Sequence, residues 1–120
     1  MADEPKPLVW RATSKADFAA FPSAVKREMG YALFLAQMGA RHPTMTRTLK
    51  GFGGATIVEV KESHAGNAYR AVYTVRYVDA VYVLHAFQKK SSKGIATPKR
   101  ELRLVETRLK ELISEREGRS

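Results

Sequence analysis

The chain has 120 residues, of which 21 are Lys or Arg and 12 are Asp or Glu, so its formal net charge is +9. This length holds one domain with a modest core and excludes two. The positive charge favours an anionic partner, which could be nucleic acid, the ribosome or an acidic protein. The absence of cysteine excludes disulfides, a thiolate nucleophile and a zinc–thiolate site.

The N-terminal segment MADEPKPLVW contains acidic residues and prolines, whereas a signal peptide has a basic start and an apolar run. The longest apolar stretches are shorter than a membrane span. We therefore expect a soluble, cytoplasmic protein without a membrane partner. We expect residues 1–7 to be a disordered lead-in, residues 8–116 to form a single domain, and residues 117–120 to be a tail.

The first half of the chain predicts a short strand at residues 8–10 followed by two helices. Ser14 and Asp17 resemble a capping box at the start of a first helix that ends near Phe21. Pro22 suits the first turn of a second helix, which runs to about Gly39 and repeats apolar residues at helical spacing. The apolar arc of this second helix is wider than an ordinary half-buried stripe, so it either packs on the sheet or also receives a partner.

Residues 39–54 predict a glycine-bearing connection that has no acidic residue and carries Arg41, Arg47 and Lys50. This segment could be a solvated loop or a lip over an RNA groove. Its GFGG end permits unusual backbone angles or the close approach of another chain. A strand is expected next, at residues 56–61.

Two apolar runs at residues 69–77 and 81–87 predict a tight antiparallel hairpin that turns near Asp79. With a side-chain period of two, alternate residues share a face of each strand. The expected faces are Tyr69, Ala71, Tyr73 and Val75 against Arg70, Val72, Thr74 and Arg76 on the first strand, and Val81, Val83, His85 and Phe87 against Tyr82, Leu84, Ala86 and Gln88 on the second.

Two residues of the hairpin do not suit an apolar core: Arg70 in its first strand and His85 near the end of its second. Lys89 and Lys90 follow directly. Because the start of one antiparallel strand lies beside the end of the next, we expect these four side chains to cluster at one end of the sheet.

The C-terminal part predicts a polar linker at residues 91–96 and a helix with Thr97 as N-cap and Pro98 at its first position. An apolar stripe then faces the sheet. The expected order is strand, two helices, three strands and a helix. That order indicates an α+β fold with a mainly antiparallel sheet, an N-terminal helical hairpin and a C-terminal helix.

An ordered set of segments supports a family assignment: LVW (8–10), GYALFLAQMGA (30–40), LKGFGGATIVEVK (49–61), YR-x-VY (69–73), VLHAFQKK (83–90) and Thr97-Pro98. Over residues 7–113 they resemble the RelE/HigB-type bacterial toxins of type II toxin–antitoxin systems, in particular a phage-derived branch of the RelE/ParE superfamily. The resemblance implies a small RelE-like domain with the β-α-α-β-β-β-α order.

The resemblance also implies an endoribonuclease that cuts messenger RNA, in many relatives on the ribosome. Its partners would be mRNA, the ribosome and a neutralising antitoxin, commonly of helix-turn-helix type, and no cofactor is expected. The family's strand Arg corresponds to Arg70, and its basic residues after the last strand correspond loosely to Lys89 and Lys90. The C-terminal Tyr of some relatives has no counterpart, since no Tyr follows Tyr82.

Metal-free RNA cleavage needs a base for the ribose 2′-OH, cations around the phosphate and an acid for the leaving 5′-oxygen. Arg70 is our candidate for the phosphate clamp, because its planar fork holds two oxygens. Lys89 and Lys90 could stabilise charge, and a Lys could also serve as base or acid if its neighbours lowered its pKa. His85 could be a general acid or base, and Glu59 is the other possible base. No spacing of His or acidic residues indicates a metal site.

Structural, non-catalytic roles are the alternatives for these residues. His85 could be a hydrogen-bonded core residue, and Arg70 could pair with Glu59. Because charge is concentrated between residues 85 and 110 and in the 39–54 connection, we expect an RNA-binding surface. Its candidate residues are Arg41, Arg47, Lys50, Lys61, Lys93, Lys99 and Arg100.

Two other classes of function fit the same resemblance. ParE-like toxins share the fold but inhibit DNA gyrase without cutting RNA. A non-catalytic basic module would only bind RNA or an antitoxin. We favour the nuclease because the basic set is retained in this chain.

Overall fold

The computed structural model describes residues 4–54, 56–90 and 96–118. A single sheet forms the centre, with its strands in the order β1-β5-β4-β3-β2. The strands are β1 Leu8–Trp10, β2 Thr46–Leu49, β3 Ile57–His64, β4 Asn67–Thr74 and β5 Val81–Lys89. The helices are α1 Ser14–Ala19, α2 Ser23–Gln37 and α3 Lys99–Ile113, and a π-helical turn, η1 Ser114–Gly118, follows α3.

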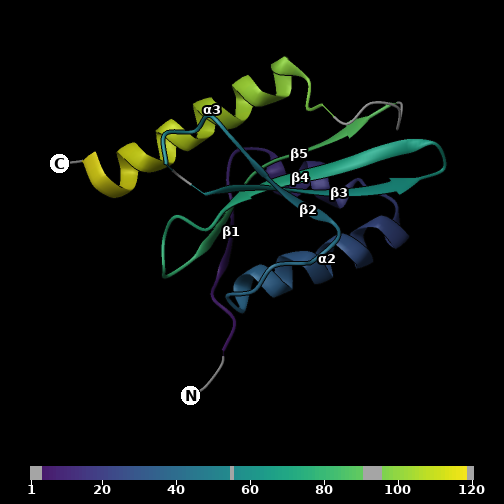
Figure 1. Ribbon diagram of the computed structural model, residues 1–120, viewed down its shortest axis with the longest axis horizontal. Coiled ribbons are helices and arrows are strands. Elements are labelled where there is room, and N and C mark those ends of the chain that lie inside the picture. Colours follow the sequence, from purple (N-terminus) through teal and green to yellow (C-terminus); the bar gives the residue numbers. More distant parts are fainter. Residues whose placement is uncertain (1–3, 55, 91–95, 119–120) are drawn as a thin grey trace.

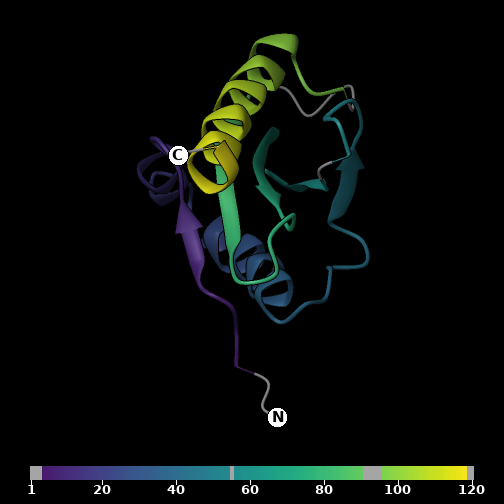
Figure 2. The ribbon, with the colours of Figure 1, turned by 90° about the vertical axis from the view of Figure 1, so that its left-hand side faces the viewer.

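The sheet lies between helices, with α3 on one face and α2 on the other (Figures 1 and 2). On the α2 face, Met29 and Leu33 pack with strand residues that include Val58. On the α3 face, Val105 and Leu109 pack with a second set of strand residues. All neighbouring strands are antiparallel except β1, which runs parallel to β5. The predicted α+β class and mainly antiparallel sheet are therefore confirmed.

The expected connection over residues 39–54 contains a strand that the sequence does not predict. Thr46–Leu49 form β2 and pair antiparallel with β3, with Arg47 opposite Glu59. The prediction of an uninterrupted loop is wrong for these residues. The segment TRTL carries one apolar residue, so it lacks the hydrophobic signal of a strand, although its threonines suit a sheet edge.

The pairing of β4 with β5 is antiparallel as predicted, but its register contains a β-bulge. Val72 lies opposite His85, whereas its neighbour Tyr73 lies opposite Val83. Leu84 is therefore the extra residue of β5. Past such a bulge, the side chains of the bulged strand exchange faces.

The predicted assignment of His85 and Phe87 to the face of Val83 is consequently wrong. Phe87 belongs to the core beneath α3, and His85 contacts two side chains of α3. Strict alternation could not reveal this exchange, because a bulge leaves no hydrophobic signature in a strand that is apolar on both faces. The bulge thus places His85 on the same face as Arg70.

The predicted capping box at the start of α1 is wrong. Ser14 is buried, and its hydroxyl donates a hydrogen bond of 3.1 Å to the backbone oxygen of Val83. The residue before the helix is Thr13, whose hydroxyl bonds to the carboxylate of Asp17 at 2.8 Å. Ser14 therefore fastens α1 to β5 instead of capping the helix.

The predicted start of α3 is also wrong by one residue, because Pro98 and not Thr97 is the N-cap. Pro22 is likewise the N-cap of α2, one position before its expected place. The Thr97 hydroxyl faces the sheet and donates to Glu59. Its oxygen accepts hydrogen bonds from Arg47 and Arg70, which leaves no acceptor position for the first helical turn.

Both ends of the described chain are tied to the sheet and helices. Lys6, expected in a disordered lead-in, exchanges hydrogen bonds with Gln37 through its backbone N–H (2.8 Å) and carbonyl (2.7 Å). Glu117, expected in the tail, accepts a hydrogen bond of 2.8 Å from the hydroxyl of Tyr77. No helix within the described ranges is long and apolar enough to cross a membrane.

Candidate functional site

A buried carboxylate lies at the centre of the sheet face that α3 covers. Glu59 is the middle residue of a row in which Arg47 of β2 lies on one side and Val72 of β4 on the other. Its side chain is 1% exposed. Burial of an ionised carboxylate is costly unless hydrogen-bond donors surround it.

Donors from three different parts of the chain meet the Glu59 carboxylate. Arg47 Nε donates to Oε1 at 2.9 Å, and the Thr97 hydroxyl donates to Oε2 at 2.7 Å. Arg70 Nη1 lies 3.4 Å from Oε2. Arg47 also donates to the Thr97 oxygen through Nη2 at 2.9 Å. The result is a connected network of two cations, one hydroxyl and one carboxylate.

Arg70 lies at the bottom of this network. Its side chain is fully buried, and Nη1 donates both to Glu59 and, at 3.3 Å, to the Thr97 oxygen. The sequence predicts Arg70 as a phosphate clamp, with pairing to Glu59 as the alternative. The structure contains that pairing, and the fully buried guanidinium presents no surface to a phosphate.

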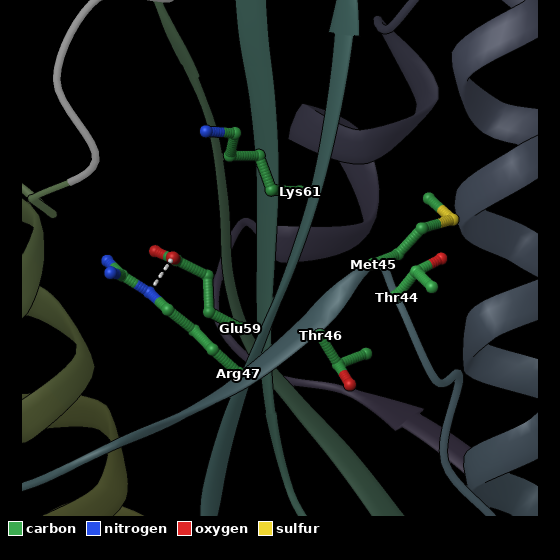
Figure 3. A pocket seen from close by; sticks show the side chains of 6 residues that line it. All are labelled: Thr44, Met45, Thr46, Arg47, Glu59 and Lys61. Atoms are coloured by element: carbon green, nitrogen blue, oxygen red, sulfur yellow. Dashed lines mark hydrogen bonds and ion pairs between the residues drawn. The ribbon is translucent and has the colours of Figure 1, made fainter.

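The solvent side of the network is a hollow of about 250 Å³ at the edge of the sheet (Figure 3). In Figure 3, Arg47 and Glu59 lie together on one side of the strands, with Lys61 farther along the same side, and Thr46 lies on the other side. Arg47 is 40% exposed, so its guanidinium touches both the buried carboxylate and the solvent. A dianion or phosphodiester entering the hollow would meet Arg47 and Lys61 first.

His85 lies under α3 and is hydrogen-bonded through both ring nitrogens. Its Nε2 is 2.6 Å from Oε1 of Glu101, and its Nδ1 is 3.0 Å from Nη1 of Arg108. A guanidinium only donates, so Nδ1 is the acceptor and Nε2 carries the proton shared with Glu101. The ring also stacks on Phe87, with centroids 5.1 Å apart.

The environment of His85 favours its neutral form. Burial lowers the pKa of His85 from its ordinary value of about 6.5, the hydrogen bond to Glu101 raises it, and the charge of Arg108 lowers it. This geometry matches the alternative of a hydrogen-bonded core histidine. A base at this position would first have to release Arg108.

The remaining basic candidates occupy several places. Lys89 lies opposite Ala68 in the sheet, and its Nζ is 3.4 Å from the carbonyl oxygen of Ala96. Lys90 is exposed at the end of β5. Lys93 lies outside the described residues. The expected cluster of four side chains is therefore a row along one strand pair and does not converge on a single point.

The predicted RNA-binding residues divide between the two faces. Arg41 lies on the α2 side, where it donates to the hydroxyls of Thr46 and Thr48 at 2.9 and 2.8 Å. Lys50 and Lys99 line a common hollow beside α3. Arg100 is exposed in the first turn of that helix. Arg41 is thus separated from the others by the sheet.

Sequence reasoning missed three side chains of this region: Thr97, Glu101 and Arg108. Thr97 was assigned to a cap, which is the usual reading of Thr-Pro before a charged helix. Glu101 and Arg108 are two turns apart on α3, a spacing that places them on one face of a helix. That spacing was visible, but a pairing with His85 depends on the bulge. Across the described residues, no three His, Asp or Glu side chains come together as a metal site would need.

Comparisons with known proteins support one family. Residues 16–110 match the family model described as "Phage derived protein Gp49-like (DUF891)". The structure is similar to a mutant of the E. coli toxin RelE in the free state, at 18% identity and a TM-score of 0.51, with 69% of this chain and 82% of that chain covered. A second similar structure is the toxin–antitoxin complex RelBE2 from Mycobacterium tuberculosis, at 17% identity and a TM-score of 0.45, with 75% and 100% covered.

No curated protein sequence gives a match. The family match spans more than half of the chain, and the similarity to RelE shows the fold. The chain therefore belongs to the Gp49-like family of phage-derived proteins and has a RelE-like fold.

Proposed function

We propose that this chain is the toxin of a toxin–antitoxin pair and acts as a metal-independent endoribonuclease on messenger RNA. The RelE-like fold supports the proposal, because the structure that it resembles is named as a toxin. The side chains around Glu59 on the α3 face support it independently. They combine a carboxylate, cations and an open hollow, which are the parts that RNA cleavage by its own 2′-OH requires.

The observation that carries the proposal is the position of Glu59. The carboxylate is 1% exposed within its network of three donors, and Glu59 is one of the residues that line the hollow with Arg47 and Lys61. A ribose 2′-OH therefore reaches the carboxylate only when the side chain of Arg47, which is 40% exposed, moves aside. A general base needs both a fixed orientation and access to the substrate.

In the proposed reaction, a phosphodiester occupies the hollow between Arg47 and Lys61. Glu59 accepts the proton of the ribose 2′-OH, whose oxygen then forms a bond to the adjacent phosphorus. The bond from phosphorus to the 5′-oxygen breaks, and that oxygen leaves with a proton. Arg47 and Lys61 bear the negative charge of the crowded phosphate. Arg70 and Thr97 hold Glu59 in place.

The proton for the leaving oxygen comes from one of the basic side chains. Lys61 lines the hollow itself, and Lys89 and Lys90 are the alternatives named by the sequence. His85 positions α3 in this scheme, because both of its ring nitrogens are engaged. The products are a 2′,3′-cyclic phosphate and a free 5′-hydroxyl.

The proposed site of action and partners are those of toxins in toxin–antitoxin pairs. The toxin acts in the cytoplasm on mRNA, with the ribosome presenting the substrate. A cognate antitoxin, of helix-turn-helix type, binds and neutralises it. The wide apolar arc of α2, where Tyr31 and Phe34 are exposed, remains the candidate antitoxin contact.

The test compares two arginines on opposite faces of the sheet. Arg47 donates to Glu59 of β3, and Arg41 donates to two threonines of β2. Arg47→Ala removes one cation of the hollow and leaves Lys61, and Arg41→Ala removes the arginine of the α2 side. Each variant is expressed in a bacterial host, and the 5′ ends of cellular transcripts are mapped by primer extension. We expect new 5′ ends inside translated frames for the parent chain and for Arg41→Ala, and none for Arg47→Ala.

Two results would contradict the proposal. Growth arrest with intact transcripts would indicate a ParE-like action on DNA gyrase. Absence of both arrest and cleavage would leave a binding module. Cleavage by purified protein on ribosomes must also persist in excess EDTA, and Glu59→Gln must lose it. The unfolding midpoint of Glu59→Gln is measured in parallel, because the substitution removes the negative charge from the buried pair with Arg70.

A further inference from the structure

A continuous groove runs along α3 beyond the proposed cleavage hollow. Three adjoining hollows form it, each about 300 Å³ in volume. The first shares Lys50 and Leu102 with the second, and the second shares Phe52 and Glu106 with the third. We call this feature the α3 groove; its walls are residues 47–53 and the outer side of α3. Figure 1 shows the segment after β2 rising from the sheet to α3.

The α3 groove begins at the proposed site. Arg47 lines both the cleavage hollow and the first part of the groove, and Thr97 lines the groove beside it. From Lys99 to Lys110 the groove follows α3 for about 16 Å at 1.5 Å per residue. A polymer bound in the hollow therefore has a path that leads away from the site along the helix.

The charge of the α3 groove is strongly positive. Its lining carries six cations, Arg47, Lys50, Arg76, Lys99, Arg103 and Lys110, and one carboxylate, Glu106. Three of the six cations are paired with carboxylates: Arg47 with Glu59, Arg76 with Glu117, and Lys110 with Glu106. Within the described part of the chain, Lys50, Lys99 and Arg103 form no salt bridge with a carboxylate. Unpaired cations in a groove attract a polyanion.

An aromatic ring lies between these cations. Phe52 is partly buried against the core beneath α3, and it lines both the second and the third hollow. The flanking Gly51 (φ 92°) and Gly53 (φ 62°) adopt left-handed backbone angles, which are strained for other residues. Phe52 is only half-buried and lines both hollows, so part of its side chain is available to the groove.

We propose that the α3 groove binds single-stranded RNA on one side of the cut, with a base stacked on Phe52. Cations that follow a backbone, interrupted by an aromatic ring, are the arrangement that binds single strands without sequence preference. An acidic protein segment would use the cations but would not need an open ring between them. The inference rests on the proposed function and names residues that recognise its substrate at a distance from the reacting phosphate.

The first test measures binding without cleavage. The full chain is titrated into a short, unstructured, 2′-O-methylated RNA, whose blocked 2′-oxygen cannot attack, and fluorescence anisotropy gives Kd. Phe52→Leu keeps an apolar contact with the core but removes the aromatic face. We expect it to weaken binding about tenfold, whereas Phe52→Tyr retains binding. Phe34→Leu, a matched loss of an exposed ring on α2, leaves Kd unchanged.

The second test separates charge from stacking through the salt dependence of Kd. Lys99→Ala removes one phosphate contact, so the slope of log K against log salt falls by about 0.7. Phe52→Leu leaves that slope unchanged, because stacking releases no counterions. Lys15→Ala, which removes an exposed cation of α1, changes neither quantity.

Failure of this inference is distinguishable from failure of the proposed function. If the chain cuts RNA but Phe52→Leu and Lys99→Ala bind like their controls, the groove proposal is overturned and the nuclease stands. If these variants weaken RNA binding as expected but the chain cuts no RNA, the nuclease is overturned and the groove stands. Unfolding midpoints of all variants near that of the parent confirm that binding is compared between folded proteins.

Discussion

The hydroxyl of Thr97 donates a hydrogen bond of 2.7 Å to Oε2 of Glu59, although the two residues are 38 positions apart in sequence. The bond joins the residue before the N-cap of α3 to β3, the strand beside the edge strand β2. It also completes the set of donors around a carboxylate that is 1% exposed. The position of α3 and the orientation of Glu59 are therefore coupled.

Thr97→Val tests this coupling, since valine keeps the shape of threonine and removes its hydroxyl. We expect the free energy of unfolding to fall by about 1–3 kcal/mol, because a buried carboxylate loses a donor. Urea unfolding measures the change. Thr107→Val, an exposed threonine of the same helix, serves as control and changes stability little. Equal stability of the two variants would show that the bond contributes nothing.

Arg70→Met tests whether Arg70 supports Glu59 from beneath. Removal of one partner of a buried ion pair leaves a charge inside the protein, so we expect a loss of about 3–5 kcal/mol. Lys61→Met changes the residue directly opposite on β3, which is only partly buried, and should cost much less. A double-mutant cycle with Glu59→Gln should recover part of the loss. Independent effects of the two substitutions would contradict the pairing.

Because Arg70 is fully buried, Arg70→Ala is a poor test of catalysis. A catalytic arginine at this position suggests an Arg70→Ala variant that is inactive but normally folded. The structure predicts instead that this variant is destabilised, because its guanidinium is fully buried. Loss of toxicity in such a variant would not by itself separate chemistry from folding, and Arg47→Ala is the sharper experiment.

His85 predicts a pH dependence of stability. Burial lowers the pKa of His85 in the folded chain below its ordinary value of about 6.5, so the unfolded chain binds the proton more readily. The contribution of neutral His85 is fully present above about pH 6.5 and is lost as the pH falls through the lowered pKa. Thermal unfolding midpoints should therefore drop on acidification from pH 7 to pH 5.

The control for this effect is His85→Gln, whose amide can donate to Glu101 and accept from Arg108 without titrating. Its midpoint should change less over the same interval. Asp79 and Glu117 do not interfere, because salt bridges lower their pKa values from ordinary values that already lie below pH 5. A pH profile of His85→Gln identical to that of the parent would assign the dependence to another group.

Arg116→Ala tests the contacts that close the C-terminal end of α3. Arg116 donates to Asp79 at 2.9 Å and to the hydroxyl of Tyr82 at 2.8 Å, and its guanidinium lies 4.2 Å from the ring centroid of Tyr77. We expect faster amide hydrogen exchange in η1 and the last turn of α3 with a small change in midpoint. Arg27→Ala on α2 should leave that exchange unchanged; equal rates in both variants would contradict the role.

The helices and the central hairpin were predictable because their apolar residues repeat with the period of the structure. The stripe of Val25, Met29 and Leu33 lies in the core as its spacing indicates. β2 was not predictable in this way, because an edge strand with alternating Thr and Arg has no apolar period. Leu84 is the extra residue of a β-bulge, which alternation does not predict, and the bulge reverses the faces of His85 and Phe87.

The candidate site was predictable in composition but not in geometry. The sequence named Glu59 and Arg70 and allowed them to pair, which they do at 3.4 Å. It listed Arg47 only among RNA-binding residues, because its contact with Glu59 depends on a strand that was not expected. The role of Thr97 depends on a tertiary contact, whereas its local sequence favours a helix cap.

The pairing of β1 with β5 has a consequence for the synthesis of this chain. Leu8 lies opposite Val81, so β1 can pair with β5 only after the residues of β5 have been synthesised. The chain then needs α3 to bring Thr97 to Glu59. Contacts this distant in sequence form late during translation. A nascent chain therefore cannot complete the network of donors around Glu59 until the residues that follow β5, including Thr97, have been synthesised.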